Sequence, residues 1–186
     1  AKEGDSVVLT KGIAIEGTAL LAYESDESLA MAGITEGTIA RAKELLFYPG
    51  ISIVPDVRVA CSEVSVTSLH DPTEGGLATG LWEVATAAGV GLEGDENTVQ
   101  VLPESSEICK ALGLDPLGLL ASGSLLITLP REDFPRLLSA LETNGIAASE
   151  IGRVTGVNEG VHLIRSGKRI PLPSFERDEL ARYLSP

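Results

Sequence analysis

Apolar residues recur along this chain with two spacings, and their order predicts a mixture of β-strands and α-helices. The apolar runs at 6–10 and 125–129 predict strands, and the second run is continuous enough for a central strand buried on both faces. The pattern predicts helices at 39–47, 55–64, 77–88, 103–113 and 131–144. It predicts shorter strands at 90–93, 98–101, 151–154 and 161–165. Because strands and helices alternate without a strict βαβ repeat, we predict an α+β fold: a three-layer α/β/α arrangement with a mixed sheet.

The stretch from Leu69 to Leu77 joins a predicted strand to a long predicted helix. The β-branched segment 64–68 predicts the strand. Asp71 suits the N-cap, and Pro72 suits the first helical position, where no amide donor is lost. Glu74 lies three residues after the cap and completes a capping box. We therefore expect the helix to begin directly after Asp71.

Capping does not explain Gly75 and Gly76, because glycine in a first turn weakens a helix by roughly 0.5–1 kcal/mol relative to alanine. One interpretation is an anion site, since a helix N-terminus presents unpaired amides and a partial positive charge. His70 and Thr73 would then add donors to a bound phosphate. The alternative is that the glycines allow close packing against a neighbouring segment and that His70 is an ordinary hydrogen-bonded residue.

The run from His70 to Leu77 resembles the HDPTxGGL signature of the AIR synthase (PurM-like) superfamily, in its C-terminal domain. The similarity extends over nearly the whole chain and is greatest to the HypE-like, AIR synthase-related branch. It implies the PurM C-terminal fold, which is partly ferredoxin-like. It assigns the whole of 1–186 to one such C-terminal domain.

The resemblance also points to substrate- or phosphate-binding residues in three segments. The first is the junction, with His70, Asp71, Thr73, Gly75 and Gly76. The second is a glycine-containing turn that leads into a helix after the first strand, with Gly17 and Thr18, and the third is the Ser122–Gly123 segment before the strand at 125–129. No catalytic residue and no metal ligand is identified in the sequence.

Members of this superfamily hold ATP and Mg²⁺ mainly through carboxylates of an N-terminal domain, often across a dimer, while the C-terminal domain closes the cleft. The given sequence contains no such N-terminal domain. The resemblance therefore implies one domain of an ATP-dependent phosphoryl-transfer or synthase-like enzyme that is inactive alone and works with an N-terminal domain in a homodimer. The alternative is a non-catalytic interaction or ligand-binding module of the same fold.

Composition narrows the possible partners. The formal net charge is −13, with 14 Lys and Arg against 27 Asp and Glu, which disfavours nucleic acids and anionic membranes. No apolar run approaches the ~20 residues that span a bilayer, so we expect a cytoplasmic protein. Cys61 and Cys109 fall in predicted helices and are expected to be buried thiols in a reducing compartment.

Overall fold

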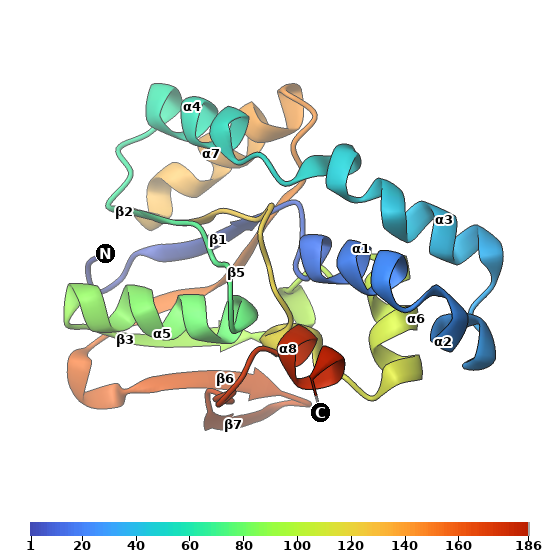
Figure 1. Cartoon of the computed structure of the whole chain (residues 1–186). Helices are drawn as coiled ribbons and strands as arrows, with labels where there is room; N and C mark the ends of the chain where they lie inside the picture. The colour runs from blue at the N-terminus through green and yellow to red at the C-terminus, as the bar shows by residue number, and fades with distance from the viewer. Residues whose placement is uncertain (186) are drawn as a thin grey trace.

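A seven-stranded mixed β-sheet forms the centre of the structure, a computed structural model that describes residues 1–185 (Figure 1). The strands are β1 (Ser6–Thr10), β2 (Ser68–His70), β3 (Gly91–Asp95), β4 (Leu126–Leu129), β5 (Ala148–Thr155), β6 (Val161–Arg165) and β7 (Lys168–Pro171). Their order across the sheet is β2-β4-β1-β5-β3-β6-β7. The β3–β6 pair is parallel and the other pairs are antiparallel. The predicted α+β fold with a mixed sheet is confirmed.

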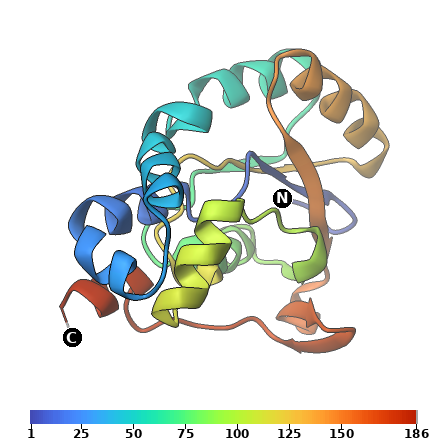
Figure 2. The ribbon, with the colours of Figure 1, turned by 90° about the vertical axis from the view of Figure 1, so that its right-hand side faces the viewer.

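Within residues 1–185 the chain forms eight α-helices. They are α1 (Ile15–Glu24), α2 (Asp26–Met31), α3 (Glu36–Glu44), α4 (Val54–Glu63), α5 (Gly76–Ala88), α6 (Pro103–Leu112), α7 (Phe134–Thr143) and α8 (Glu179–Leu184). Helix α5 lies on one side of the sheet, and α4 and α7 lie together on the other (Figure 1). Helices α1, α2, α3 and α6 pack on one another in a separate group beyond one end of the strands (Figures 1 and 2).

Alternation along β1 produces the two layers. Val7 and Leu9 are buried in the same cluster as Leu81 of α5. Val8 points to the opposite face and shares a cluster with Leu137 of α7. Burial on both faces explains why Val7, Val8 and Leu9 are all apolar and lack the polar alternation of a half-exposed strand.

Two of the predicted strands differ from the structure. In the segment 64–68, Ser68 alone belongs to β2, because Val64 ends α4 and the chain reaches the sheet only at Thr67, whose amide donates to Thr128 O at 2.8 Å. The predicted strand 98–101 is a 3₁₀ turn followed by one bridge, between Ile13 and Val101.

One prediction for a single helical residue is also wrong. Cys109 is buried as predicted, but Cys61 is exposed because α4 turns Asp56 and Ala60 inward instead. The last helix is capped by Asp178, whose side chain accepts from the Leu180 amide at 2.7 Å.

The segment 36–63 is long and apolar enough to cross a bilayer by length and composition alone. It is not one helix. Helices α3 and α4 contain nine and ten residues, and the backbone between them is non-helical at Tyr48. Each helix is therefore about half the length that a membrane span requires.

Candidate functional site

Strand order brings the three predicted segments together at one end of neighbouring strands, where β1 and β2 end and β4 begins. Strands β1 and β2 run parallel to each other on either side of the antiparallel β4, and the pairing places Leu9, Leu126 and His70 in one row. The chain therefore leaves β1 at Lys11 and leaves β2 at Asp71 beside the segment 121–125 that enters β4. We call this meeting point of Lys11, Asp71 and 121–125, together with the first turns of α1 and α5, the motif edge.

The segment 117–123 runs between the first turns of α1 and α5 and explains two of the predicted glycines. The Gly17 amide donates to Leu120 O at 3.1 Å. A Cβ on Gly17 would lie 2.6 Å from Leu119 Cγ, and one on Gly76 would lie 2.8 Å from Leu119 O and closer still to Leu117 O. These glycines are thus required for close packing, which is the alternative that the sequence left open.

The predicted capping box at Asp71 is wrong. Helix α5 begins at Gly76, and its N-cap is Gly75, which has a left-handed backbone with φ 76°. Asp71 and Glu74 lie in the loop before it, and the Gly76 amide donates to Thr73 O at 3.1 Å. The left-handed glycine pair reverses the chain, so the helix cannot start at Pro72.

The anion expected at this helix N-terminus is supplied by the chain itself. The Gly75 amide donates to Oδ2 of Asp178 at 2.7 Å. The sequence held no signal for this contact, because the two residues are 103 positions apart. An internal carboxylate thus accepts from the Gly75 amide, and phosphate binding by Gly75 stays a prediction.

His70 and Asp71 bring titratable groups to the motif edge. Nε2 of His70 lies 3.0 Å from Oε2 of Glu83 on α5, close enough for an ion pair but not aligned for a hydrogen bond. Asp71 is exposed, yet partial burial raises the pKa of its carboxyl above the ordinary value, against the lowering effect of His70 and Lys11. The carboxylate of Glu16 in α1 raises the pKa of Asp71 further. A carboxyl with a raised pKa is a candidate proton acceptor.

Thr18 does not belong to the site. Its buried hydroxyl donates to Oγ of Ser105 at 2.8 Å and joins α1 to α6. A threonine in a first turn can face either the cleft or a neighbouring helix, and spacing alone does not distinguish the two.

The segment Ser122–Gly123 lies at the motif edge, where Ser122 is half-buried. Gly123 has φ 110°, and a Cβ there would lie 3.1 Å from Gly50 O, so it packs against the connection between α3 and α4. Ser124 is buried and its hydroxyl donates to the carbonyls of Gly12 and Ala121. This segment therefore fixes the two strands of the motif edge relative to each other.

Lys11 is unusual, because a lysine is almost never fully buried unless it is paired. It is buried, its backbone is left-handed with φ 60°, and its Nζ lies 3.2 Å from Oδ2 of Asp56. Nothing in the sequence indicated that Asp56, in the first turn of α4, is its partner.

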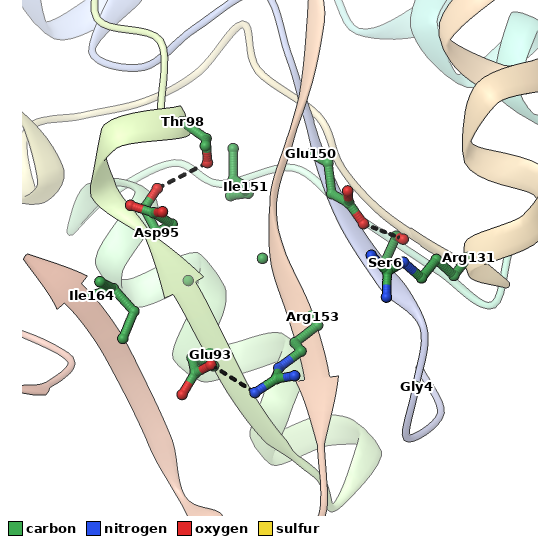
Figure 3. Close-up of a pocket in the computed structure, with 12 residues that line it drawn as sticks. Gly4, Ser6, Glu93, Asp95, Thr98, Arg131, Glu150, Ile151, Arg153 and Ile164 are labelled. Carbon is green, nitrogen blue, oxygen red and sulfur yellow. Dashed lines mark hydrogen bonds and ion pairs between the residues drawn. The ribbon is translucent and has the colours of Figure 1, made fainter. Parts of the chain in front are cut away.

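A separate hollow of about 450 Å³ lies over β5 and β3, on the part of the sheet that α4 and α7 leave uncovered (Figure 3). Two of its carboxylates already have partners: Arg153 donates to Glu93 at 2.9 Å, and the Ser6 hydroxyl donates to Glu150 at 2.5 Å. None of the nine predicted site residues lines this hollow. We therefore place the candidate site at the motif edge.

The chain offers little on its own to hold a magnesium nucleotide. Within residues 1–185, no group of three His, Cys, Asp or Glu side chains is placed to hold a metal ion. The glycines that would let a phosphate approach the backbone are filled by packing or by Asp178. The described residues therefore do not fit a resident ATP–Mg²⁺.

Known proteins share both the fold and the sequence. A crystal structure of E. coli HypE aligns with a TM-score of 0.79 at 25% identity, over 98% of this chain and 53% of that chain. A crystal structure of the hydrogenase maturation protein HypE in complex with ATP aligns with a TM-score of 0.69 at 25% identity, over 97% of this chain and 53% of that one.

Sequence comparison gives the same relationship. Carbamoyl dehydratase HypE of Cupriavidus necator is 34% identical over 167 residues, which is 89% of this chain and 44% of the relative. The chain thus spans about half the length of the relatives it matches. The family model described as AIR synthase related protein, C-terminal domain, matches residues 2–164. This chain belongs to the AIR synthase-related C-terminal domain family, in its HypE-like branch.

Proposed function

We propose that this chain acts as the C-terminal domain of an ATP-dependent, HypE-like enzyme and contributes substrate or phosphate contacts from the motif edge. The observation that carries the proposal is the convergence of Lys11, Asp71 and the segment 121–125 at one edge of the sheet. Strand ends and helix first turns that meet in this way are a common place for ligands, because loops there are free to vary while the sheet stays rigid.

The chain covers 44% of the C. necator relative, so we infer that a domain of similar length works with it. That N-terminal domain would carry most of the ATP and Mg²⁺ site, within a cytoplasmic homodimer. ATP supplies the phosphoryl group, and phosphoryl transfer depends on positioning and charge neutralisation. In this chain His70 offers the positive charge when protonated, and Asp71 is the group we assign to proton transfer.

Calorimetric titration of ATP and Mg²⁺ tests the proposal. We expect no binding by the chain alone, and binding by an equimolar mixture with the N-terminal half of a HypE relative. Asp71→Asn should weaken the response of the mixture to substrate while the chain remains folded. The matched control is Asp26→Asn, an exposed carboxylate on α2. ATP turnover by the chain alone would contradict the proposal.

A non-catalytic interaction module is the second candidate, and one observation favours it. Phe47 and Tyr48 are 78% and 84% exposed, and Val54 beside them is 52% exposed. Large exposed aromatic side chains are typical anchors in protein interfaces. If Phe47→Ser abolishes association with the N-terminal half and no mixture binds ATP, this reading gains over the enzyme.

A further inference from the structure

Lys11 is held in an unusual place for a lysine. Among the residues that the structure describes, it is the only buried basic side chain, at 7% exposure. Its backbone has φ 60°, a conformation that costs a non-glycine residue roughly 1–2 kcal/mol. Strain of this kind persists where the surrounding structure holds it, and it concentrates at binding sites.

The head group of Lys11 is only partly satisfied by the protein. Its Nζ donates to Ser52 O at 2.9 Å and to Asp56 Oδ2 at 3.2 Å. An ammonium group has three donors, so these contacts use two of them. Asp56 is 1% exposed, and its Oδ1 has no hydrogen-bond partner among residues 1–185. One donor and one buried acceptor thus remain side by side.

Both residues line a cavity of about 380 Å³. This is roughly ten times the ~30 Å³ share of a single water molecule and falls within the ~300–1,000 Å³ of small-molecule sites. Its walls are largely apolar, with Pro49, Leu102 and Ile146, and the ring of Tyr48 is at its mouth.

We propose that this cavity binds a neutral hydroxylated ligand of the sugar or polyol class. A hydroxyl group accepts from Lys11 Nζ and donates to Asp56 Oδ1, which satisfies both free groups at once. The Lys11–Asp56 pair has no net charge, and a chain of net charge −13 repels anions, so a neutral ligand is favoured over a phosphate. The apolar walls and the Tyr48 ring suit the C–H faces of a sugar. This site shares Lys11 with the motif edge, but its other polar side chains, Asp56, Gln100 and Asn144, lie outside the segments assigned to the proposed function.

Titration of the 186-residue chain with D-ribose, followed by ¹H–¹⁵N NMR, tests this inference. We expect saturable shifts of the Lys11 backbone amide and of the side-chain amides of Gln100 and Asn144, which line the cavity. Inorganic phosphate should not produce them. Tyr48→Ala, at a highly exposed position, should weaken ribose binding several-fold, whereas Tyr23→Ala on α1 should not.

Asp56→Asn tests the polar contact. We expect it to weaken binding about tenfold, the loss typical of a hydrogen bond to a charged group. Thermal unfolding of the Asp56→Asn variant shows whether a loss of binding is a loss of folding. If this variant does not fold, the Tyr48→Ala variant tests the inference in its place. The inference is overturned if ribose and glycerol cause no saturable shifts, if phosphate causes them instead, or if neither variant changes them. If only water binds at Asp56 Oδ1, ribose and glycerol cause no saturable shifts, and the inference is overturned.

Discussion

The carboxylate of Asp178 accepts a hydrogen bond from the backbone amide of Gly75 at 2.7 Å, and its other oxygen accepts from the Leu180 amide at 2.7 Å. One side chain therefore caps α8 and occupies the N-terminus of α5. We expect Asp178→Ala to lower the free energy of unfolding by about 2 kcal/mol, because both amides lose a charged acceptor. Asp178→Asn should cost less, since its amide oxygen still accepts one bond.

Urea unfolding measures this loss, and hydrogen exchange at the Gly75 amide measures the contact directly. Glu176→Ala is the control, because Glu176 is exposed in the same segment. Equal stabilities of the Asp178→Ala and Glu176→Ala variants would show that the cap contributes nothing in solution.

Gly76 is needed for two reasons that a matched variant separates. Gly76→Ala should destabilise the chain by about 2–4 kcal/mol, because a left-handed alanine is strained and its Cβ would collide with the 117–119 carbonyls. Gly89 has nearly the same φ, 66° against 67°, but open space around it. Gly89→Ala should cost only about 1 kcal/mol. Equal losses in urea unfolding would refute the close-packing role of Gly76.

The pKa of Asp71 should respond to its charged neighbours in opposite directions. Glu16→Gln should lower it, because the Glu16 carboxylate raises it, and His70→Gln should raise it further, because His70 lowers it. A carboxyl whose pKa is raised by folding binds protons more tightly in the folded state, so its contribution to stability decreases as pH rises from about 4 through the raised value. Carboxyl ¹³C NMR titration measures each pKa. Shifts of the same sign in both variants would refute this arrangement.

Glu93 links three strands and should support stability in the opposite pH direction. It pairs with Arg153 of β5 and Arg169 of β7, each at 2.9 Å, and the Arg169 hydrogen bond holds its pKa below the ordinary 4.5. The ionised form is favoured by folding, so this stabilisation is present above pH 4.5 and is lost as pH falls through the lowered pKa. Between about pH 5 and pH 3, the Tm of the Glu93→Gln variant should fall less than the Tm of the unaltered chain. Thermal unfolding measures this loss of Tm for both. Glu132→Gln, at an exposed position, should leave that loss unchanged.

The two cysteines should differ sharply in reactivity. Burial raises the pKa of the Cys109 thiol to about 12, whereas Cys61 is exposed. Because the thiolate is the reactive form, a thiol reagent should modify one cysteine per folded chain and two in urea. The Cys61→Ser variant should lose the fast reaction entirely. Rapid labelling of Cys109 in the folded chain would contradict the described core.

The sequence was most informative where a residue's neighbours along the chain determine its surroundings. The runs that form β1 and β4 are buried on both faces, so their continuous apolar pattern was enough to identify them. The pattern could not place Thr18, whose partner Ser105 is 87 positions away. The capping box at Asp71 satisfied every local rule and still failed, because segment 117–119 requires a left-handed turn at Gly76. The contacts of Lys11 with Asp56 and of Gly75 with Asp178 depend on tertiary structure in the same way.

Strand β1 lies at the centre of the sheet, yet both of its partners come late in the chain, since β4 begins at Leu126 and β5 at Ala148. During synthesis, the apolar residues Val7, Val8 and Leu9 must therefore wait for more than a hundred further residues before they can pair. Contacts so distant in sequence slow folding, because the entropy of a long loop is lost before the contacts form. We expect the sheet to close only after the ribosome has released β5, so that β1 stays unpaired in the growing chain until then.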